Sequence, residues 1–356
     1  MPWQWINRIF NRASSVPPHY ESTLNANHSE PSATIDTNKL NLDETENHLI
    51  QSTSNELESA FFCWLLNCTE SELQMTTDQL NEKEQKILKT LDHDALSIDQ
   101  IPRRPASFPL LIKLLNKDDS STREISNTLL ADPALATQTL KTANSPFFRV
   151  SSEPIDSVEQ AVFILGSEGI RNIISATVMM PLMKGGNSKE GEFSQKVWEW
   201  GLLSATASDQ YSFYQGHESS ALYILGLLPA LTYLLIYRSL LSYSADDPSI
   251  GELEPSMIKS IIQKRNWKMC HEICQQWGLP PASNKYLLDA ERPSTDKSLS
   301  PLRDGIFMGT HKILQSVSRS PIADRDVHRL SRAPKAVDKK VIKYLEEKLK
   351  AASAIP

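Results

Sequence analysis

The chain has 356 residues, of which 40% are hydrophobic and 22% are charged, with a formal net charge of −6 at pH 7. This composition is ordinary for a soluble globular protein with a sizeable core, and it excludes the low-complexity and fibrous classes. Apolar residues recur at spacings of three and four from about residue 54 onward, with little strand-like alternation. The pattern predicts an all-α protein.

The first twelve residues, "MPWQWINRIFNR", combine apolar and basic side chains. A short helix would gather most of the apolar ones on one side, and exposed aromatic residues tend to mark contact sites. The candidate docking residues for a partner are Trp3, Trp5, Ile6, Ile9 and Phe10. Their target is a protein groove or a membrane surface, and the alternative is a loose end that folds back on the domain.

Residues 13–50 are rich in polar residues and poor in apolar ones. Such a composition cannot bury enough apolar surface to fold, which predicts a disordered tether. Residues 51–100 then form a helical lead-in, beginning with "SNELESAFFCWLL", which places Leu57, Phe61, Trp64 and Leu65 on one helix face. The His93–Asp94 pair lies at the polar end of a helix with no second histidine nearby, so we interpret it as a helix end.

Three prolines in "IPRRPASFP", residues 101–109, mark a domain edge. The helix after it, "TREISNTLLA", presents Ile125, Leu129 and Leu130 as core residues. Asp132 then caps a helix that has proline at its first position. Ser157 and Gln160 match a capping box, and Gly166 ends that helix.

The segment "ALYILGLLPALTYLLIY", residues 221–237, carries no charge and contains Pro229. Its 17 residues are fewer than the roughly 20 that a membrane span needs. No cluster of Lys and Arg flanks it, so we predict a buried core helix with a kink or break at the proline, with a membrane span as the alternative.

The charge is uneven along the chain, with 6 Lys and Arg against 16 Asp and Glu in residues 1–100, and 12 against 6 in residues 301–356. A basic segment can contact nucleic acid or acidic lipid. We favour the solvated face of a helix, predicted over residues 336–351, because few aromatic residues lie among the charges to stack on bases. We therefore expect no nucleic-acid partner.

Four cysteines are present: Cys63, Cys68, Cys270 and Cys274. The N-terminus lacks the apolar stretch of a secretory signal, so we expect a cytoplasmic protein with reduced thiols. "CHEIC" places two cysteines one helical turn apart. The spacing differs from that of a zinc knuckle, which favours small buried side chains over metal ligands.

Several segments together resemble the HDOD domain, a bacterial signalling relative of the HD metal-dependent phosphohydrolases. They are "RPASFPLLIKLL", "DPALATQTLKTANSPFF", "IDSVEQAVFILGSEGIRNII", "VWEWGLLSATA", "LGLLPALT" and "WGLPP", in this order over about residues 101–300. The resemblance implies a compact all-α bundle, preceded here by residues 1–50 and 51–100 and followed by a basic helical segment over 301–356.

HD hydrolases hold a divalent ion with a first histidine, a His-Asp pair and a distant aspartate, and the ion activates a water for attack on phosphorus. Against the family pattern, Trp200 stands at the first histidine, and Pro229 and Ala230 stand at the His-Asp pair. Asn266 stands at a later histidine, and the His-His found beyond it is lost in "LLDAER". The resemblance therefore implies a degenerate metal site.

We assign no catalytic, cofactor-binding or metal-ligating residue. The matched polar residues Asp132, Asn144, Ser145 and Arg171 are interpreted as caps and buried hydrogen-bonding groups, with a binding surface as the alternative.

The sequence thus predicts a regulatory protein, not an enzyme, acting on a protein partner in bacterial signal transduction. One alternative is a metal-dependent nucleotide phosphohydrolase with ligands recruited from His217, His271, Cys270 or Cys274. The other is a regulator that binds a nucleotide or RNA without turnover.

Overall fold

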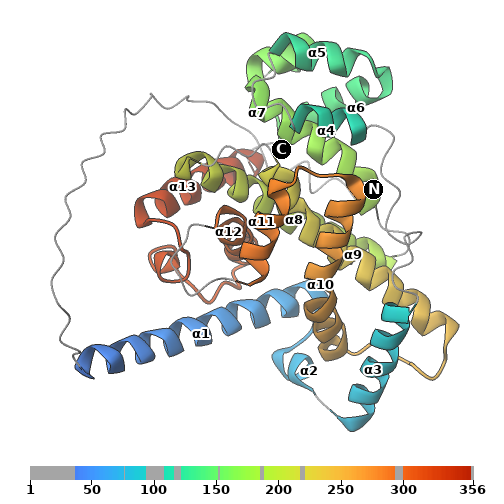
Figure 1. The fold of residues 1–356 in the computed structure, drawn as a ribbon, viewed down its shortest axis with the longest axis vertical. Helices are drawn as coiled ribbons and strands as arrows, with labels where there is room; N and C mark the ends of the chain where they lie inside the picture. The colour runs from blue at the N-terminus through green and yellow to red at the C-terminus, as the bar shows by residue number, and fades with distance from the viewer. Residues whose placement is uncertain are drawn as a thin grey trace.

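The computed structural model describes residues 37–75, 77–93, 108–115, 122–150, 153–184, 188–216, 221–292 and 300–353. Within these ranges the chain forms thirteen α-helices, two 3₁₀ helices and no strand (Figure 1). The predicted all-α fold is therefore confirmed. The helices are α1 Thr37–Leu66, α2 Glu70–Gln74, α3 Asp78–His93, α4 Phe108–Leu115, α5 Thr122–Leu130, α6 Pro133–Ala143, α7 Val158–Met179, η2 Met180–Met183, α8 Ser188–Gln215, α9 Leu222–Asp246, α10 Pro255–Trp277, α11 Ala282–Glu291, α12 Pro301–Ser316, η3 Val327–Arg329 and α13 Lys335–Ser353.

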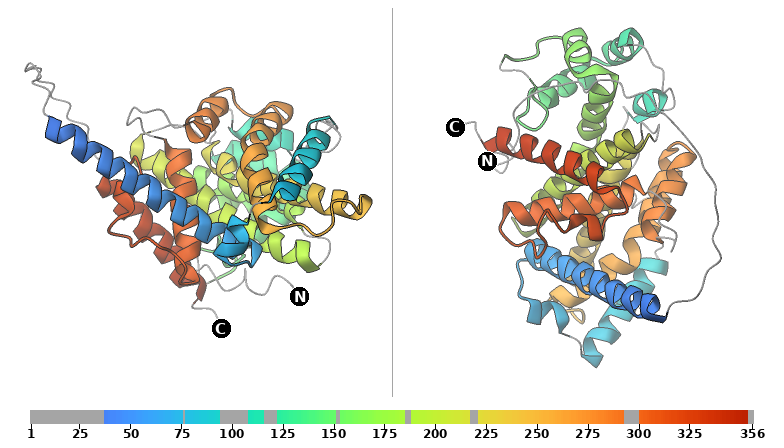
Figure 2. Two further views of the ribbon diagram at one scale, coloured as in Figure 1. Left: turned by 90° about the horizontal axis from the view of Figure 1, so that it is seen from below. Right: turned by 90° about the vertical axis from the view of Figure 1, so that its left-hand side faces the viewer.

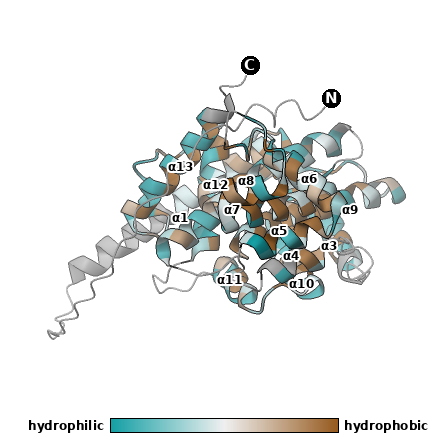
Figure 3. Cartoon of the chain, turned by 90° about the horizontal axis from the view of Figure 1, so that it is seen from above, coloured by the Kyte–Doolittle hydropathy of each residue, from teal (hydrophilic) through white to brown (hydrophobic). Residues whose placement is uncertain are grey.

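Helix α8 is the centre of the bundle. It packs most extensively against α12 and α9, and α13 also lies on it. Apolar residues gather around this crossing (Figure 3). Trp198 is 1% exposed, and Leu227 and Leu228 of α9 are 1% and 0% exposed, so these three residues belong to the core.

Small residues allow α8 and α12 to approach closely. A Cβ added to Gly309 would lie 2.6 Å from the backbone nitrogen of Ser204, and one added to Gly305 would lie 2.5 Å from that of Ser208. Because real side chains do not tolerate such separations, glycine at both positions is what lets the two helix backbones touch.

Helices α4 to α7 pack on one another and form a separate group, seen at the top of Figure 1, which joins the rest through contacts of α7 with α9. The helix signals in this group act as predicted at Asp132, whose carboxylate accepts a hydrogen bond from the Leu135 nitrogen at 3.0 Å. Gly166 has φ 71° and interrupts α7 between two helical parts. Its positive φ is a conformation that glycine adopts without strain.

The capping box predicted from Ser157 and Gln160 forms only in part. The Ser157 hydroxyl accepts a hydrogen bond from the Gln160 nitrogen at 3.1 Å. The Gln160 side chain reaches one residue further back and accepts from the Asp156 nitrogen at 2.9 Å, instead of from Ser157. The start of the helix was thus predicted correctly, but its second hydrogen bond was not.

The N-terminal helices cover the bundle on one side. α1 packs against α12 and α8, while α2 and α3 pack against α10 (Figure 2). The predicted apolar face of α1 is confirmed, since Leu57, Phe61, Trp64 and Leu65 are all buried. α1 begins at Thr37, within the segment predicted as a tether, and residues 13–36 of that segment lie outside the described residues.

Two helical stretches, Val158–Met183 and Leu222–Asp246, are long and apolar enough to cross a membrane by length and composition. In the apolar window of the second, 72% of the residues are buried inside the protein. α9 remains helical through Pro229 and makes contacts with α8, α10 and α7. The prediction of a buried core helix is therefore confirmed, with the proline inside a continuous helix.

Candidate functional site at the crossing of α8, α9 and α10

The residues that the resemblance to HD hydrolases places at metal-ligand positions come from three helices. Pro229 and Ala230 lie in α9, Trp200 in α8 and Asn266 in α10, and all four are buried. A Cβ added to Gly201 would lie 2.7 Å from the Ala230 Cβ, which shows that α8 and α9 are in close contact here. The fold thus brings the α8 and α9 positions together, and Asn266 of α10 joins them through its contact with Thr232 of α9.

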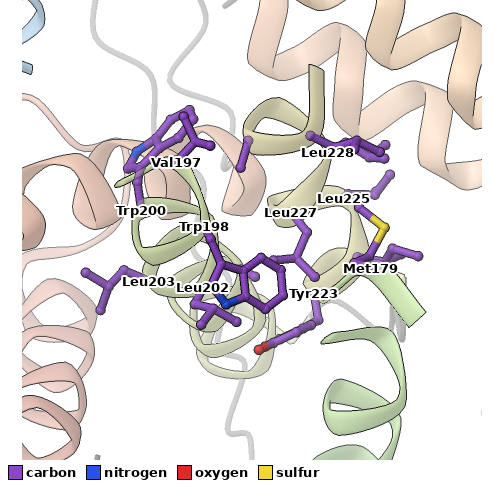
Figure 4. Packing of buried hydrophobic residues seen from close by; sticks show 14 of the residues in the cluster. Met179, Val197, Trp198, Trp200, Leu202, Leu203, Tyr223, Leu225, Leu227 and Leu228 are labelled. Atoms are coloured by element: carbon purple, nitrogen blue, oxygen red, sulfur yellow. The ribbon is translucent and has the colours of Figure 1, made fainter. Parts of the chain in front are cut away.

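Trp200 fills the α8 side of this crossing. Its indole is 3% exposed and donates a hydrogen bond from Nε1 to the Thr310 hydroxyl at 2.9 Å. Its ring lies 4.8 Å from Phe61 and 5.0 Å from Tyr233, measured between ring centroids. In Figure 4 Trp200 and Trp198 extend from different sides of α8. The indole therefore joins α8 to α1, α9 and α12 at once.

Pro229 and Thr232 define the α9 side. Proline has no backbone N–H, so one helical hydrogen bond is absent at Pro229. The Thr232 hydroxyl lies 3.0 Å from the Pro229 carbonyl oxygen and also contacts the Asn266 amide oxygen, to which it donates. Asn266 is thus held by a neutral hydroxyl.

Cys270 completes this polar group on α10. Its sulfur lies 3.6 Å from the Thr232 hydroxyl oxygen and 3.8 Å from the Asn266 amide oxygen. Burial raises the pKa of the Cys270 thiol to about 12. Because Cys270 is 0% exposed within the regular helix α10, its surroundings favour a structural thiol.

The other polar residues of the family-like segments mainly hold the backbone. The Asn144 amide donates to the Ile155 carbonyl oxygen at 2.8 Å and accepts from the Ile155 nitrogen at 2.7 Å. Ser145 donates to the Thr142 carbonyl oxygen at 2.6 Å. Arg171 is 1% exposed and pairs with Glu168. These contacts agree with the interpretation of caps and buried hydrogen bonds.

The residues considered as recruited metal ligands do not form a ligand cluster where they are described. His271 contacts Glu291 at 3.1 Å between Nε2 and Oε2, and Cys274 is 2% exposed. Among the described residues, no group of three His, Cys, Asp and Glu side chains is arranged to hold a metal ion. His217, Asp94 and the candidate docking residues Trp3, Trp5, Ile6, Ile9 and Phe10 lie outside the described residues.

A polar group near the C-terminus, built around the buried residues His311 and Lys312, was missed by the sequence reasoning. His311 lies between Ser320 and Asp324, with nitrogen–oxygen distances of 2.9 and 2.7 Å, and Lys312 pairs with Asp324 and Glu346 at 2.9 and 3.1 Å. Burial lowers the pKa of His311. Burial alone would raise the pKa of Asp324, but hydrogen bonds from His311 and Lys312 outweigh it and hold that pKa at about 2. The group fastens the segment after α12 onto α12 and α13.

Helix α13 has an exposed basic face and a buried apolar face. Lys339 and Lys343 are exposed, whereas Val341 and Leu345 on the opposite face are fully buried. The predicted amphipathic helix is therefore confirmed. Its exposed lysines form the solvated face that the sequence analysis favoured.

The sequence reasoning also missed Glu199, which lies between Trp198 and Trp200 in the sequence of α8. It is 8% exposed, and burial raises the pKa of its carboxyl to about 8, while a hydrogen bond from Gln195 at 3.0 Å opposes this effect. The carboxyl is therefore largely protonated at neutral pH. No local sequence pattern marks a buried acid, because its burial depends on helices that are distant in the chain.

Comparison with known proteins adds three findings. Residues 101–293, more than half of the chain, match the HDOD domain. The Bacillus subtilis (strain 168) protein YuxH, described as uncharacterized, is 23% identical over 193 residues, which cover 51% of this chain. The match spans 46% of YuxH, so this chain corresponds to about half the length of that relative.

Two solved structures share the fold. A Geobacter sulfurreducens HDOD domain protein of unknown function has a TM-score of 0.52 at 16% identity, covering 76% of this chain and 97% of that one. A Shewanella amazonensis SB2B protein provisionally named a phosphohydrolase has a TM-score of 0.51 at 18% identity, covering 72% and 96%. Because the match to the HDOD domain over residues 101–293 spans more than half of the chain, this chain belongs to the HDOD domain family.

Proposed function

We propose that this chain is a non-catalytic regulatory protein that acts in bacterial signal transduction by binding a protein partner in the cytoplasm. The observation that carries the proposal is the packing at the α8–α9–α10 crossing. There the positions equivalent to metal ligands hold Trp200, Pro229, Ala230 and Asn266, all buried in contacts with neighbouring helices.

The chemistry of these four side chains supports the proposal. A divalent ion of the kind that activates water needs several imidazole and carboxylate groups that converge on one point. An indole, a methyl group and a pyrrolidine ring supply no such ligand, and the Asn266 oxygen already accepts a hydrogen bond from Thr232. Among the described residues, the indole of Trp200 contacts Phe61, Tyr233 and Thr310, none of which carries a carboxylate.

The partner-binding part of the proposal rests on the N-terminal motif. Trp3, Trp5, Ile6, Ile9 and Phe10 stand next to Arg8 and Arg12, ahead of a polar segment. A short amphipathic helix of this kind is suited to lie in an apolar groove on another protein. No cofactor is needed for this role.

The proposed absence of catalysis is tested on the purified full-length protein by elemental analysis and by assays on cyclic dinucleotides and nucleoside monophosphates. We expect no stoichiometric manganese, iron or zinc and no turnover. One equivalent of metal, together with turnover that a chelator abolishes, would establish the alternative of an HD-type phosphohydrolase.

The binding part is tested by capture of partners from the native cell with the full chain and with a Trp3→Ala, Trp5→Ala variant. We expect one partner to be retained by the parent and lost from the variant. Equal capture by the two proteins would remove the N-terminal motif from the proposal.

A further inference from the structure

The end of α1 brings two cysteines together. The helix ends at Leu66, and Asn67 has φ 53°, the left-handed conformation that commonly follows a helix. The Cys68 nitrogen donates to the Cys63 carbonyl oxygen at 3.1 Å. This is the six-to-one hydrogen bond of a Schellman turn, in which the side chains at these two positions usually make contact.

Neighbouring residues fix this turn in place. Lys196 of α8 donates to the Trp64 carbonyl oxygen at 2.8 Å and to the Asn67 amide oxygen at 2.5 Å. The Asn67 amide donates to Glu192 at 2.6 Å. Thr69 then caps α2 with a complete capping box. The two cysteines thus lie on a turn between α1 and α2 that hydrogen bonds to α8 hold in place.

The second cysteine pair of the chain has a different setting. Cys270 and Cys274 lie within the regular helix α10 and are 0% and 2% exposed. Cys63 and Cys68 are only partly buried, so reagents reach the turn between α1 and α2 more readily than the interior of α10.

The turn places the Cys63 and Cys68 side chains in contact, since the two thiols share a hydrogen bond. A disulfide needs Cα atoms roughly 4.4–6.8 Å apart, and the hydrogen bond from the Cys68 nitrogen to the Cys63 carbonyl oxygen at 3.1 Å turns the chain back on itself at this point.

We propose that Cys63 and Cys68 form a redox-responsive dithiol, which is converted to an intrachain disulfide by exchange with a low-molecular-weight disulfide. One thiol loses its proton and attacks a sulfur of the oxidant, giving a mixed disulfide and releasing one small thiolate. The other cysteine loses its proton and attacks the protein-bound sulfur of the mixed disulfide, which releases the second small thiolate. The protein loses two hydrogens in total, and the oxidant is reduced to two thiols.

The surroundings predict how this site responds to pH. Burial raises the pKa of Cys63, and burial, followed by the neighbouring Cys63 thiol, raises the pKa of Cys68 to about 11. The thiolate fraction is therefore small at neutral pH. Since that fraction grows about tenfold per pH unit below the pKa, the rate of oxidation should grow about tenfold between pH 7 and pH 8.

The experiment uses the full-length protein and glutathione disulfide as the oxidant. After quenching in acid and denaturation, alkylation counts the free thiols, and peptide mass spectrometry locates the disulfide. We expect the four thiols to fall to two, with a mass loss of about 2 Da in the peptide that holds Cys63 and Cys68 and recovery with dithiothreitol. Cys270 and Cys274 are the internal control and should remain alkylated.

Two single substitutions make the test specific. Cys68→Ser and, separately, Cys63→Ser should each retain a glutathione adduct on the remaining cysteine, because the resolving thiol is absent. Four free thiols after oxidation, a stable glutathione adduct on the parent protein, a Cys270–Cys274 disulfide or a disulfide between two chains would each overturn the proposal.

Discussion

The contact between α8 and α12 offers a sharp test of the packing, through the substitution Gly309→Ala. A Cβ at this position would lie 2.6 Å from the Ser204 nitrogen and 2.7 Å from its Cα. Ordinary contacts at a Cβ begin at 3.4 Å, so the two backbones would have to separate by about 0.8 Å. Neither atom belongs to a side chain that can rotate away.

The expected free-energy change has two opposing parts. Alanine in the middle of a helix is more stable than glycine by about 1 kcal/mol. Overpacking a dense interface costs about 1–3 kcal/mol, and occasionally more. Because the clash is with the backbone of α8, we expect the upper part of that range and a net loss of about 1–2 kcal/mol.

Gly191 is the matched control for this substitution. It lies in the same bundle, within α8, and a Cβ added there meets no atom within 4 Å. Gly191→Ala should therefore raise the stability by about 0.5–1 kcal/mol. The assay is denaturant unfolding, comparing midpoints at unchanged slope. If Gly309→Ala unfolds at the same denaturant concentration as the parent, or later, the close approach of α8 and α12 is incorrect.

Three other outcomes are expected. Leu228→Ala should lower the unfolding free energy by about 2–5 kcal/mol, because Leu228 is fully buried in α9, and an unchanged midpoint would contradict that burial. Glu199→Gln should stabilise the protein at pH 9 but have little effect at pH 4. The Glu199 carboxyl has a pKa of about 8 in the folded protein and an ordinary pKa in the unfolded chain, so the folded protein loses stability as the pH rises between these two values. Equal effects of the substitution on denaturation at both pH values would refute this reasoning. Trp3→Ala with Trp5→Ala should reduce co-sedimentation with anionic vesicles if residues 1–12 bind a membrane surface, and unchanged co-sedimentation would leave only a protein target for the motif.

Local sequence signals predicted the helices well, because helix starts and ends depend on nearby residues. Asp132 caps its helix as expected, and Gly166 interrupts α7 with a positive φ. Apolar periodicity also identified the buried face of α1. It failed at Leu130, which is 47% exposed, although Ile125 and Leu129 of the same helix are fully buried. Leu130 follows Leu129 by one residue and therefore points about 100° away from it on the helix.

Contacts between distant segments could not be predicted in this way. Asp324 approaches His311 and Lys312 from a segment beyond α12, and Glu346 approaches Lys312 from α13. No sequence spacing links these residues to one another. The pairing of Asn266 with Thr232 likewise depends on how α10 packs against α9, which no spacing within either helix encodes.

The crossing of α8, α9 and α10 shows why the proposed loss of the metal site involves several positions together. A site that loses only one ligand would keep buried polar groups without partners, which is unfavourable in a low-dielectric interior. Here the indole of Trp200 occupies space among Phe61, Tyr233 and Thr310, while Thr232 satisfies Asn266. Replacing Pro229 and Ala230 alone by histidine and aspartate would leave Trp200 and Asn266 in their present contacts. The added charge would then be buried without a counterion, so we infer that the crossing has been reorganised into a packed core whose present residues support one another.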